Sequence, residues 1–218
     1  MELSDDNDAF RWGLTAHGTF TVKSMYSDYM NGHTRFLHKY IWRMKVPLKI
    51  RILMCFLHRK VLLTKDNLAK RNWQGSKKCC FCDQDESIHH LFISCPFAKV
   101  IWRIVHMTFN LSPPTNITNL FGNWLRGINK KDKVQIRVGV CALLWAIWNV
   151  RNDFVFNKPR ASSFLQVIPL ATHWIHTWSY LQPAERQQAM DFGCSRLETV
   201  ARDLYSRCGW RLDNQLTC

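Results

Sequence analysis

The chain has 218 residues, of which 47% are hydrophobic and 13% aromatic, including ten tryptophans. This composition fits a chain that buries a core and excludes an intrinsically disordered one. The formal net charge of +14 favours a polyanionic partner, with nucleic acid as the first expectation.

The cysteines and the N-terminus point to an intracellular protein, without resolving nucleus from cytoplasm. Nine cysteines, an odd number, suggest free thiols rather than a disulfide framework. The first ten residues are acidic and lack the apolar stretch of a secretory signal. The longest apolar run, Val138–Trp148, is too short to span a bilayer and predicts a buried helix. We therefore expect no membrane association.

The first element predicted is a β-hairpin. Phe10, Trp12 and Leu14 alternate with polar residues, and "GTFTV" continues the pattern after a turn at Gly18, where a positive φ is expected. The run from Lys23 to Met30 has helical spacing.

A basic helix follows. Pro47 suits a helix start, and Ile50, Leu53, Met54 and Leu57 recur at the spacing of one buried face, so the helix should end near Lys60. Thr64 then has the position and side chain of an N-cap for a second, short helix.

Positive charge is concentrated around these helices. Residues 35–78 hold thirteen lysines and arginines but a single acid, Asp66. Such a segment can contact nucleic-acid phosphates, which positions a protein without reading sequence. The alternative is a solvated basic face that keeps the protein soluble. The candidate contacts are Arg43, Lys45, Lys49, Arg51, Arg59, Lys60, Lys70 and Arg71.

The stretch "KKCCFCDQDESIHHLFISCPF" contains six candidate metal ligands, four cysteines and two histidines. Cys79 and Cys82 have the C-x2-C spacing that places two thiolates on one ion, and His90 and Cys95 have an x4 spacing that can supply the second pair. The remaining two candidates, Cys80 and His89, are left without a ligand role, although His89 could donate a hydrogen bond to a ligand.

Four protein ligands close the coordination sphere of zinc, whereas a catalytic zinc keeps one position open for water. The pattern therefore predicts a structural Zn²⁺ site. The alternative is that the four residues never meet and are small core residues. A retroviral-type zinc knuckle has a shorter central spacer and usually glycines, whereas no glycine occurs here between Gly75 and Gly122.

The remainder of the chain predicts helices. Pro96 opens a helical pattern that ends before "NLSPPTNITN", and a second helical block runs from residue 119 to 156. Helical spacing returns at 163–181 and 184–207.

Three blocks in this order resemble a known family: "FRWGLTAHGTFTVKSMY", "IWRMKVPLKIRILMCFLHRKVLLTKDNLAKR" and "CCFCDQDESIHHLFISCPFAKVIW". Between Asp8 and Trp102 they resemble the zinc-binding domain that follows the polymerase region in reverse transcriptases of plant non-LTR retrotransposons. The resemblance implies zinc ligands at Cys79, Cys82, His90 and Cys95, although His89 stands where the family usually has an acid. "CALLWAIWNVRNDFVFN" resembles the tract that often precedes a ribonuclease H domain in such elements.

Catalytic signatures of either enzyme are not found. A polymerase holds two metal ions on paired aspartates, but the acid pairs here, Asp5–Asp6 and Asp85–Glu86, lie outside any apolar strand–turn–strand setting. The acids of the last sixty residues lie on helix-like stretches rather than strands; they are Glu185, Asp191, Glu198, Asp203 and Asp213. We therefore predict a protein that is not an enzyme.

The expected fold is mainly α, with a small N-terminal β-hairpin, helices around one structural zinc and a helical C-terminal extension. The predicted parts are a zinc-binding domain at 8–108, a linker at 109–118, a helical connector at 119–158 and a helical tail at 159–218. The expected function is nucleic-acid contact by a non-catalytic domain derived from a retrotransposon reverse transcriptase, with other domains of the element as further partners. The alternative is a protein-interaction module or an inert remnant, whose exposed tryptophans would be Trp124, Trp145, Trp148, Trp174 and Trp178.

Overall fold

The computed structural model describes residues 11–24, 40–120, 123–156 and 166–208. The chain divides into two compact units, Met1–Tyr40 and Ile41–Cys218. The zinc-binding segment from Ile41 onward therefore shares one unit with the tracts that follow it. The boundaries predicted inside this unit, at residues 108, 118 and 158, stay a prediction.

The predicted N-terminal hairpin is wrong for the residues described. No strand occurs within 11–24; instead the Trp12 amide donates to the Gly18 carbonyl at 2.7 Å and closes a turn. The Trp12 ring packs edge-on against Phe20 at 4.9 Å, and its indole N–H donates to the Ser24 hydroxyl at 2.8 Å. The alternating aromatic residues thus pack on each other across a loop, and an isolated two-stranded hairpin is marginal in water. The positive φ expected at Gly18 is confirmed, at 69°.

The helix predicted from Lys23 to Met30 lies mostly outside the described residues. In the second unit, residues 41–43 are helical, and α3, Leu48–His58, follows with Pro47 as its N-cap. The four residues predicted to face the core from α3 are all buried. α3 ends at the predicted place because Lys60 takes a left-handed conformation, with φ of 59°.

Two helices flank the segment that carries the candidate metal ligands. The short α4, Lys65–Ala69, precedes it, and α5, Pro96–Phe109, follows it. Pro96 begins α5 because its missing amide hydrogen costs nothing at a first turn. Asn110 ends α5 in a left-handed conformation, and its amide donates to the His106 carbonyl. Short 3₁₀ turns at Ile117–Asn119 and Asn123–Leu125 then lead to the next helix.

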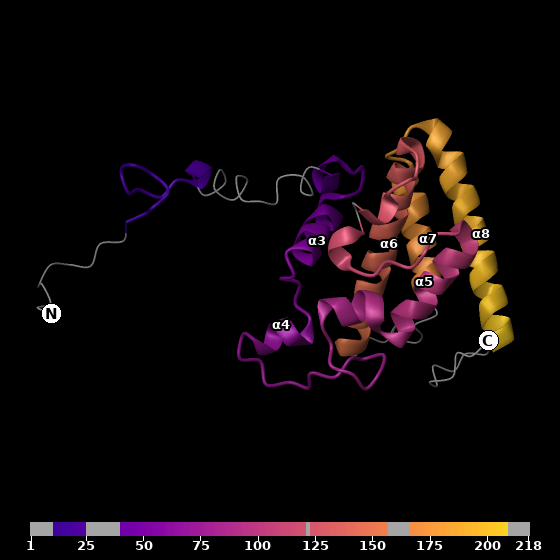
Figure 1. Ribbon diagram of the computed structural model, residues 1–218, viewed down its shortest axis with the longest axis horizontal. Coiled ribbons are helices and arrows are strands. Elements are labelled where there is room, and N and C mark those ends of the chain that lie inside the picture. The colour runs from indigo at the N-terminus through magenta and orange to yellow at the C-terminus, as the bar shows by residue number, and fades with distance from the viewer. Residues whose placement is uncertain (1–10, 25–39, 121–122, 157–165, 209–218) are drawn as a thin grey trace, which may run out of the picture. The chain divides into compact units, whose positions relative to one another are not determined.

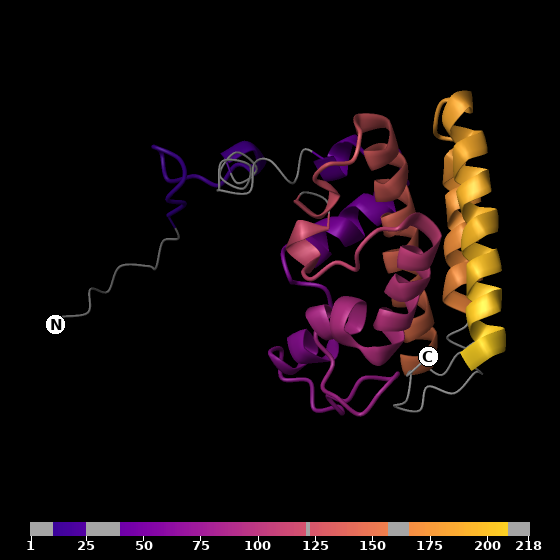
Figure 2. The same ribbon diagram turned by 45° about the vertical axis from the view of Figure 1, so that its right-hand side comes forward.

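The long helix α6, Lys130–Val155, is central to the second unit, as Figures 1 and 2 show. It contacts α3 and also α7, Val167–Ser179. α7 packs on α8, Ala184–Cys208, and α8 in turn packs on α5. A short turn joins α7 to α8, so these two helices run side by side in opposite directions (Figure 2).

The interior of α6 is apolar, with Val138, Leu144 and Ile147 fully or nearly fully buried. The helix has 26 residues and passes a length and hydropathy test for a membrane span, unlike the eleven-residue run considered alone. Half of its most apolar window is buried inside the structure, as expected for a core helix, which passes the same test.

Candidate metal centre

The four residues predicted as zinc ligands meet in the structure. One ligand atom from each of Cys79, Cys82, His90 and Cys95 lies within 4.8 Å of all the others. The Cys82 and Cys95 sulfurs are 3.8 Å apart, and the Cys82 sulfur is 3.1 Å from His90 Nε2. Cys79, His90 and Cys95 are buried, whereas Cys82 is half-buried. The alternative in which these residues stay apart in the core is therefore excluded.

A narrow loop, residues 78–85, supplies Cys79 and Cys82, and we call it the zinc loop. Its base is closed by an isolated antiparallel bridge between Lys78 and Asp85, with the Cys79 amide donating to the Gln84 carbonyl at 2.8 Å. Inside the loop the Phe81 amide donates to the Cys79 sulfur at 3.4 Å, which stabilises a thiolate. The Phe81 ring anchors the loop by packing on Phe97 of α5, with ring centres 4.2 Å apart.

A π-helical turn, His90–Ser94, supplies the second pair. The Cys95 amide donates to the His90 carbonyl at 2.8 Å, a bond between residues five apart. In an α-helix residues five apart point about 140° away from each other, because each residue turns by about 100°. The wider π-turn brings the side chains of His90 and Cys95 to the same side, so both can bind one ion. His89, one residue earlier, is exposed.

The pKa values of the clustered cysteines are shifted in opposite directions. The pKa of Cys79 lies far below the usual thiol range, first because Cys80 and then because Cys95 donates a hydrogen bond to it. The pKa values of Cys80 and Cys95 are raised by the same bonds and by burial. Burial also raises the pKa of Cys82.

The donor set fits zinc. Zinc–sulfur bonds of about 2.3 Å in a tetrahedron require sulfur–sulfur distances of about 3.8 Å, which matches the 3.8 Å between Cys82 and Cys95. Three thiol sulfurs and one imidazole nitrogen are a common structural set for this ion. A bound Zn²⁺ would deprotonate the thiols and remove the charge repulsion among them.

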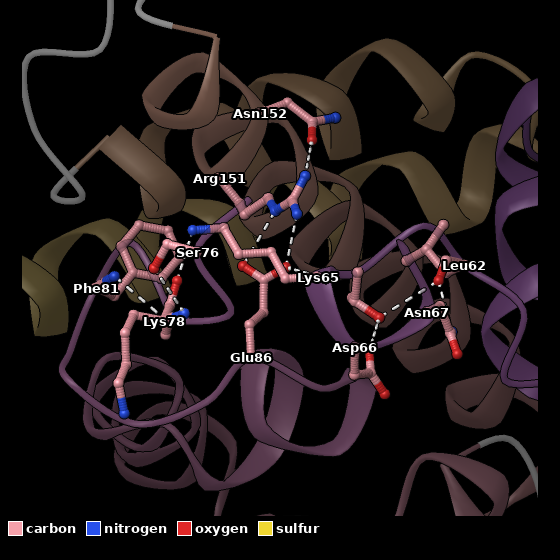
Figure 3. A network of polar contacts seen from close by, with 12 residues as sticks. Leu62, Lys65, Asp66, Asn67, Ser76, Lys78, Phe81, Glu86, Arg151 and Asn152 are labelled. Atoms are coloured by element: carbon pink, nitrogen blue, oxygen red, sulfur yellow. Dashed lines mark hydrogen bonds and ion pairs between the residues drawn. The ribbon is translucent and has the colours of Figure 1, made fainter. Parts of the chain in front are cut away.

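Glu86, directly after the zinc loop, forms a buried network that the sequence did not predict (Figure 3). Its carboxylate accepts two bonds from Arg151 of α6, at 2.6 and 3.2 Å, and both side chains are almost fully buried. The same carboxylate accepts from the Lys65 amide at 2.9 Å. The cap predicted for α4 is thus corrected: the Thr64 hydroxyl donates to Asp66, and Glu86 satisfies the first amide of the helix.

A second group of potential metal ligands, Cys79, Cys80 and Glu86, also lies close together. The bonds of Glu86 argue against a metal ion in this second group. The Arg151 guanidinium occupies both oxygens of Glu86, so that carboxylate is neutralised without a metal ion. Asp85 is paired with Lys78 at 3.1 Å on the surface. The Asp85–Glu86 pair is accordingly engaged in ion pairs within the protein.

Six of the candidate phosphate contacts are exposed, including Lys49. The five of them that make no cation–π contact are called the exposed basic set: Arg43, Lys45, Lys60, Lys70 and Arg71. The others are more engaged: the Lys49 ammonium lies 5.3 Å from the ring centres of both Trp145 and Trp174, and Arg51 donates to the Val46 and Trp42 carbonyls. Arg59 is half-buried. Within the exposed basic set, Lys70 also donates to Asn67 at 2.9 Å.

The five tryptophans expected on an exposed surface are half-buried or buried within the second unit. Trp178 is buried, and the other four are half-buried. Trp124 packs edge-on against Trp102, and Trp148 lies under the Arg151 guanidinium. Two of the acids of the C-terminal extension also make internal bonds, Asp191 with His176 and Glu198 with Thr172.

Residues 20–102 match the family model described as zinc-binding in reverse transcriptase. This segment is therefore similar to the zinc-binding domain of reverse transcriptases, which is an accessory domain rather than a catalytic one. It carries all four clustered ligand candidates. No curated protein and no solved structure matches the chain.

Proposed function

We propose that this reverse-transcriptase-type zinc-binding domain holds one structural Zn²⁺ through Cys79, Cys82, His90 and Cys95 and contacts nucleic-acid phosphates through the exposed basic set. The observation that carries the zinc assignment is the convergence of these four ligand atoms within 4.8 Å. Four protein ligands leave no position for a reactive water, so the ion stabilises the chain and takes no part in chemistry.

The zinc fixes two segments that the backbone leaves otherwise weakly joined. The loop with Cys79 and Cys82 has only one bridge at its base, and the π-turn with His90 and Cys95 leads directly into α5. Because the ligands come together only in the folded chain, the free energy of zinc binding adds to the stability of this region. Chelation should therefore unfold the zinc loop before the rest of the unit.

Zinc content tests this assignment. The purified full-length chain should carry one zinc ion, and Cys82→Ser should lower both the zinc affinity and the thermal midpoint. Cys80→Ser is the matched control, because Cys80 lies next to a ligand but outside the tetrahedral set. Equal zinc content and stability in the native protein and in Cys82→Ser would refute the ligand assignment.

Nucleic-acid contact is supported by the position of the exposed basic set. Its members flank α3 and α4, in a segment with one acid, Asp66, among thirteen lysines and arginines. Lysine and arginine on phosphates release condensed counterions, which gives an affinity independent of base sequence. The contact is therefore expected to be general for RNA or DNA rather than base-specific.

A salt titration tests this contact. The logarithm of the association constant should fall linearly with the logarithm of salt concentration, by about 0.7 per phosphate contact on single strands. Lys60→Gln should lower this slope, whereas Lys131→Gln, an exposed charge on α6 outside the basic segment, should leave it unchanged. An affinity that does not change with salt would refute the proposal and favour a protein-interaction module.

The intracellular location, with no membrane association, belongs to the same proposal. It is supported by the free thiols of the described cysteines and by the half-buried state of the most apolar window of α6. Other domains of a reverse transcriptase are the protein partners that the family match favours.

A further inference from the structure

A cavity away from the zinc site lies among four helices. It has a volume of about 600 Å³ and is lined by residues of α5, α6, α7 and α8 together with Leu111, Trp124 and residues 127–129. Pockets that bind small molecules measure roughly 300–1,000 Å³. Several segments contribute to its walls, so a small molecule bound there would contact several helices at once.

Two glycines leave this space open. Gly139 of α6 and Gly193 of α8 both line the cavity in helix interiors, where glycine destabilises a helix relative to alanine. Neither has a positive φ. A Cβ atom at Gly139 would lie 3.9 Å from Ile175 and one at Gly193 would lie 3.5 Å from Phe109, both ordinary contacts. Backbone conformation and helix packing therefore do not require glycine at these positions, and what the two glycines share is a place in the cavity wall.

The chemistry of the walls defines the class of ligand. Although the chain has thirty lysines and arginines and nine histidines, none of the described residues that line the cavity is Lys, Arg or His. The walls offer no cation to an anionic ligand, and residues such as Val140 and Leu143 make them largely apolar. The polar lining residues lie at the start of α6: Asn129 and Asp132 are exposed, and Gln135 is half-buried. Of these, Asp132 already accepts one bond from the Asn129 amide, at 2.6 Å.

The described residues that line the cavity include one cysteine, Cys194. Its pKa is raised to about 12, mainly by burial, so the thiol keeps its proton at neutral pH. A protonated buried thiol behaves as a small apolar group. The site is therefore built for binding rather than for chemistry.

We propose that this cavity binds a neutral, largely apolar small molecule that carries a hydrogen-bond donor, with the donor directed at the carboxylate of Asp132. The apolar part of the ligand contacts α5, α6 and α8 beside Gly139 and Gly193. This function is independent of the zinc site and of the nucleic-acid contact.

The test uses the zinc-loaded full-length chain and N-phenyl-1-naphthylamine, a neutral aromatic probe with one N–H donor whose fluorescence rises in apolar sites. Binding should saturate at one probe per chain. Gly193→Leu places a side chain in the cavity and should weaken binding at least tenfold. Ser195→Leu adds the same side chain to an exposed position of α8 that does not line the cavity, and should leave the affinity unchanged.

The double variant Gly139→Ala/Gly193→Ala guards against misfolding of the leucine variant, because alanine favours a helix at both positions. It should raise the thermal midpoint and weaken probe binding several-fold. Absence of saturable binding by the native chain would overturn the proposal. Equal affinities of the native chain and the double variant would overturn it as well.

Discussion

The buried pair of Glu86 and Arg151 should be a main determinant of the stability of the second unit. The two side chains form two bonds and are almost fully buried. Removing one partner from such a pair typically costs about 3–5 kcal/mol, because the other charge stays buried without compensation. In a unit of this size each kcal/mol shifts the thermal midpoint by about 2–4 °C. Arg151→Met should therefore lower the midpoint by roughly 6–20 °C.

A double-mutant cycle separates this pair from general packing. Glu86→Leu should cost a similar amount, plus about 1 kcal/mol for the lost cap of α4. The double variant should be more stable than the sum of the two single changes, by about 3 kcal/mol, because no charge is left buried. Urea unfolding of the zinc-loaded chain, followed by circular dichroism, measures all four proteins.

Asp85→Asn is the matched control for this cycle. It breaks the neighbouring ion pair with Lys78. Because the side chains of Asp85 and Lys78 are 68% and 62% exposed, the change should cost less than about 1 kcal/mol. Single variants within 1 kcal/mol of the native protein, or strictly additive effects in the double variant, would refute the role assigned to the buried pair.

Other changes test the metal centre and the helices. His89→Ala should keep the zinc affinity, whereas His90→Ala should lower it by orders of magnitude; competition with a chromophoric chelator measures both, and equal losses would contradict the ligand choice. Zinc affinity should rise with pH by about tenfold per unit for each proton displaced, because the pKa values of Cys82 and Cys95 are raised in the metal-free chain; an affinity that does not change between pH 6 and 8 would contradict this charge state. Gly139→Ala should stabilise the chain by up to about 1 kcal/mol in urea unfolding, and a loss of stability would show that the glycine has a packing role.

Helices were the most predictable part of the fold. α3 and α5 each combine a proline at the start with a regular apolar face, and both signals come from local sequence. The N-terminal hairpin failed because alternation records only which side chains gather on one side. In residues 11–24 the same residues gather by direct contact of Trp12 with Phe20, without a ladder of backbone bonds.

Within the candidate site, spacing brought out the four residues that meet, because the cysteine and histidine positions are fixed by short turns. The role of Glu86 left no such signal. Its partner Arg151 belongs to a helix far along the chain, and both residues resemble ordinary charges in the sequence. Among the basic residues, charge alone also did not distinguish Lys49, held over two tryptophans, from the exposed basic set.

The position of Arg151 has a consequence for the use of this domain as a module. The family match ends at Trp102, yet the guanidinium that neutralises Glu86 belongs to α6, outside the matched segment. A transplant of residues 20–102 into another protein would carry every zinc-site residue but leave an acid without its counterion. The segment that folds with all its charges paired is therefore longer than the matched segment. A transplant should include α6 or replace Glu86 by an apolar residue.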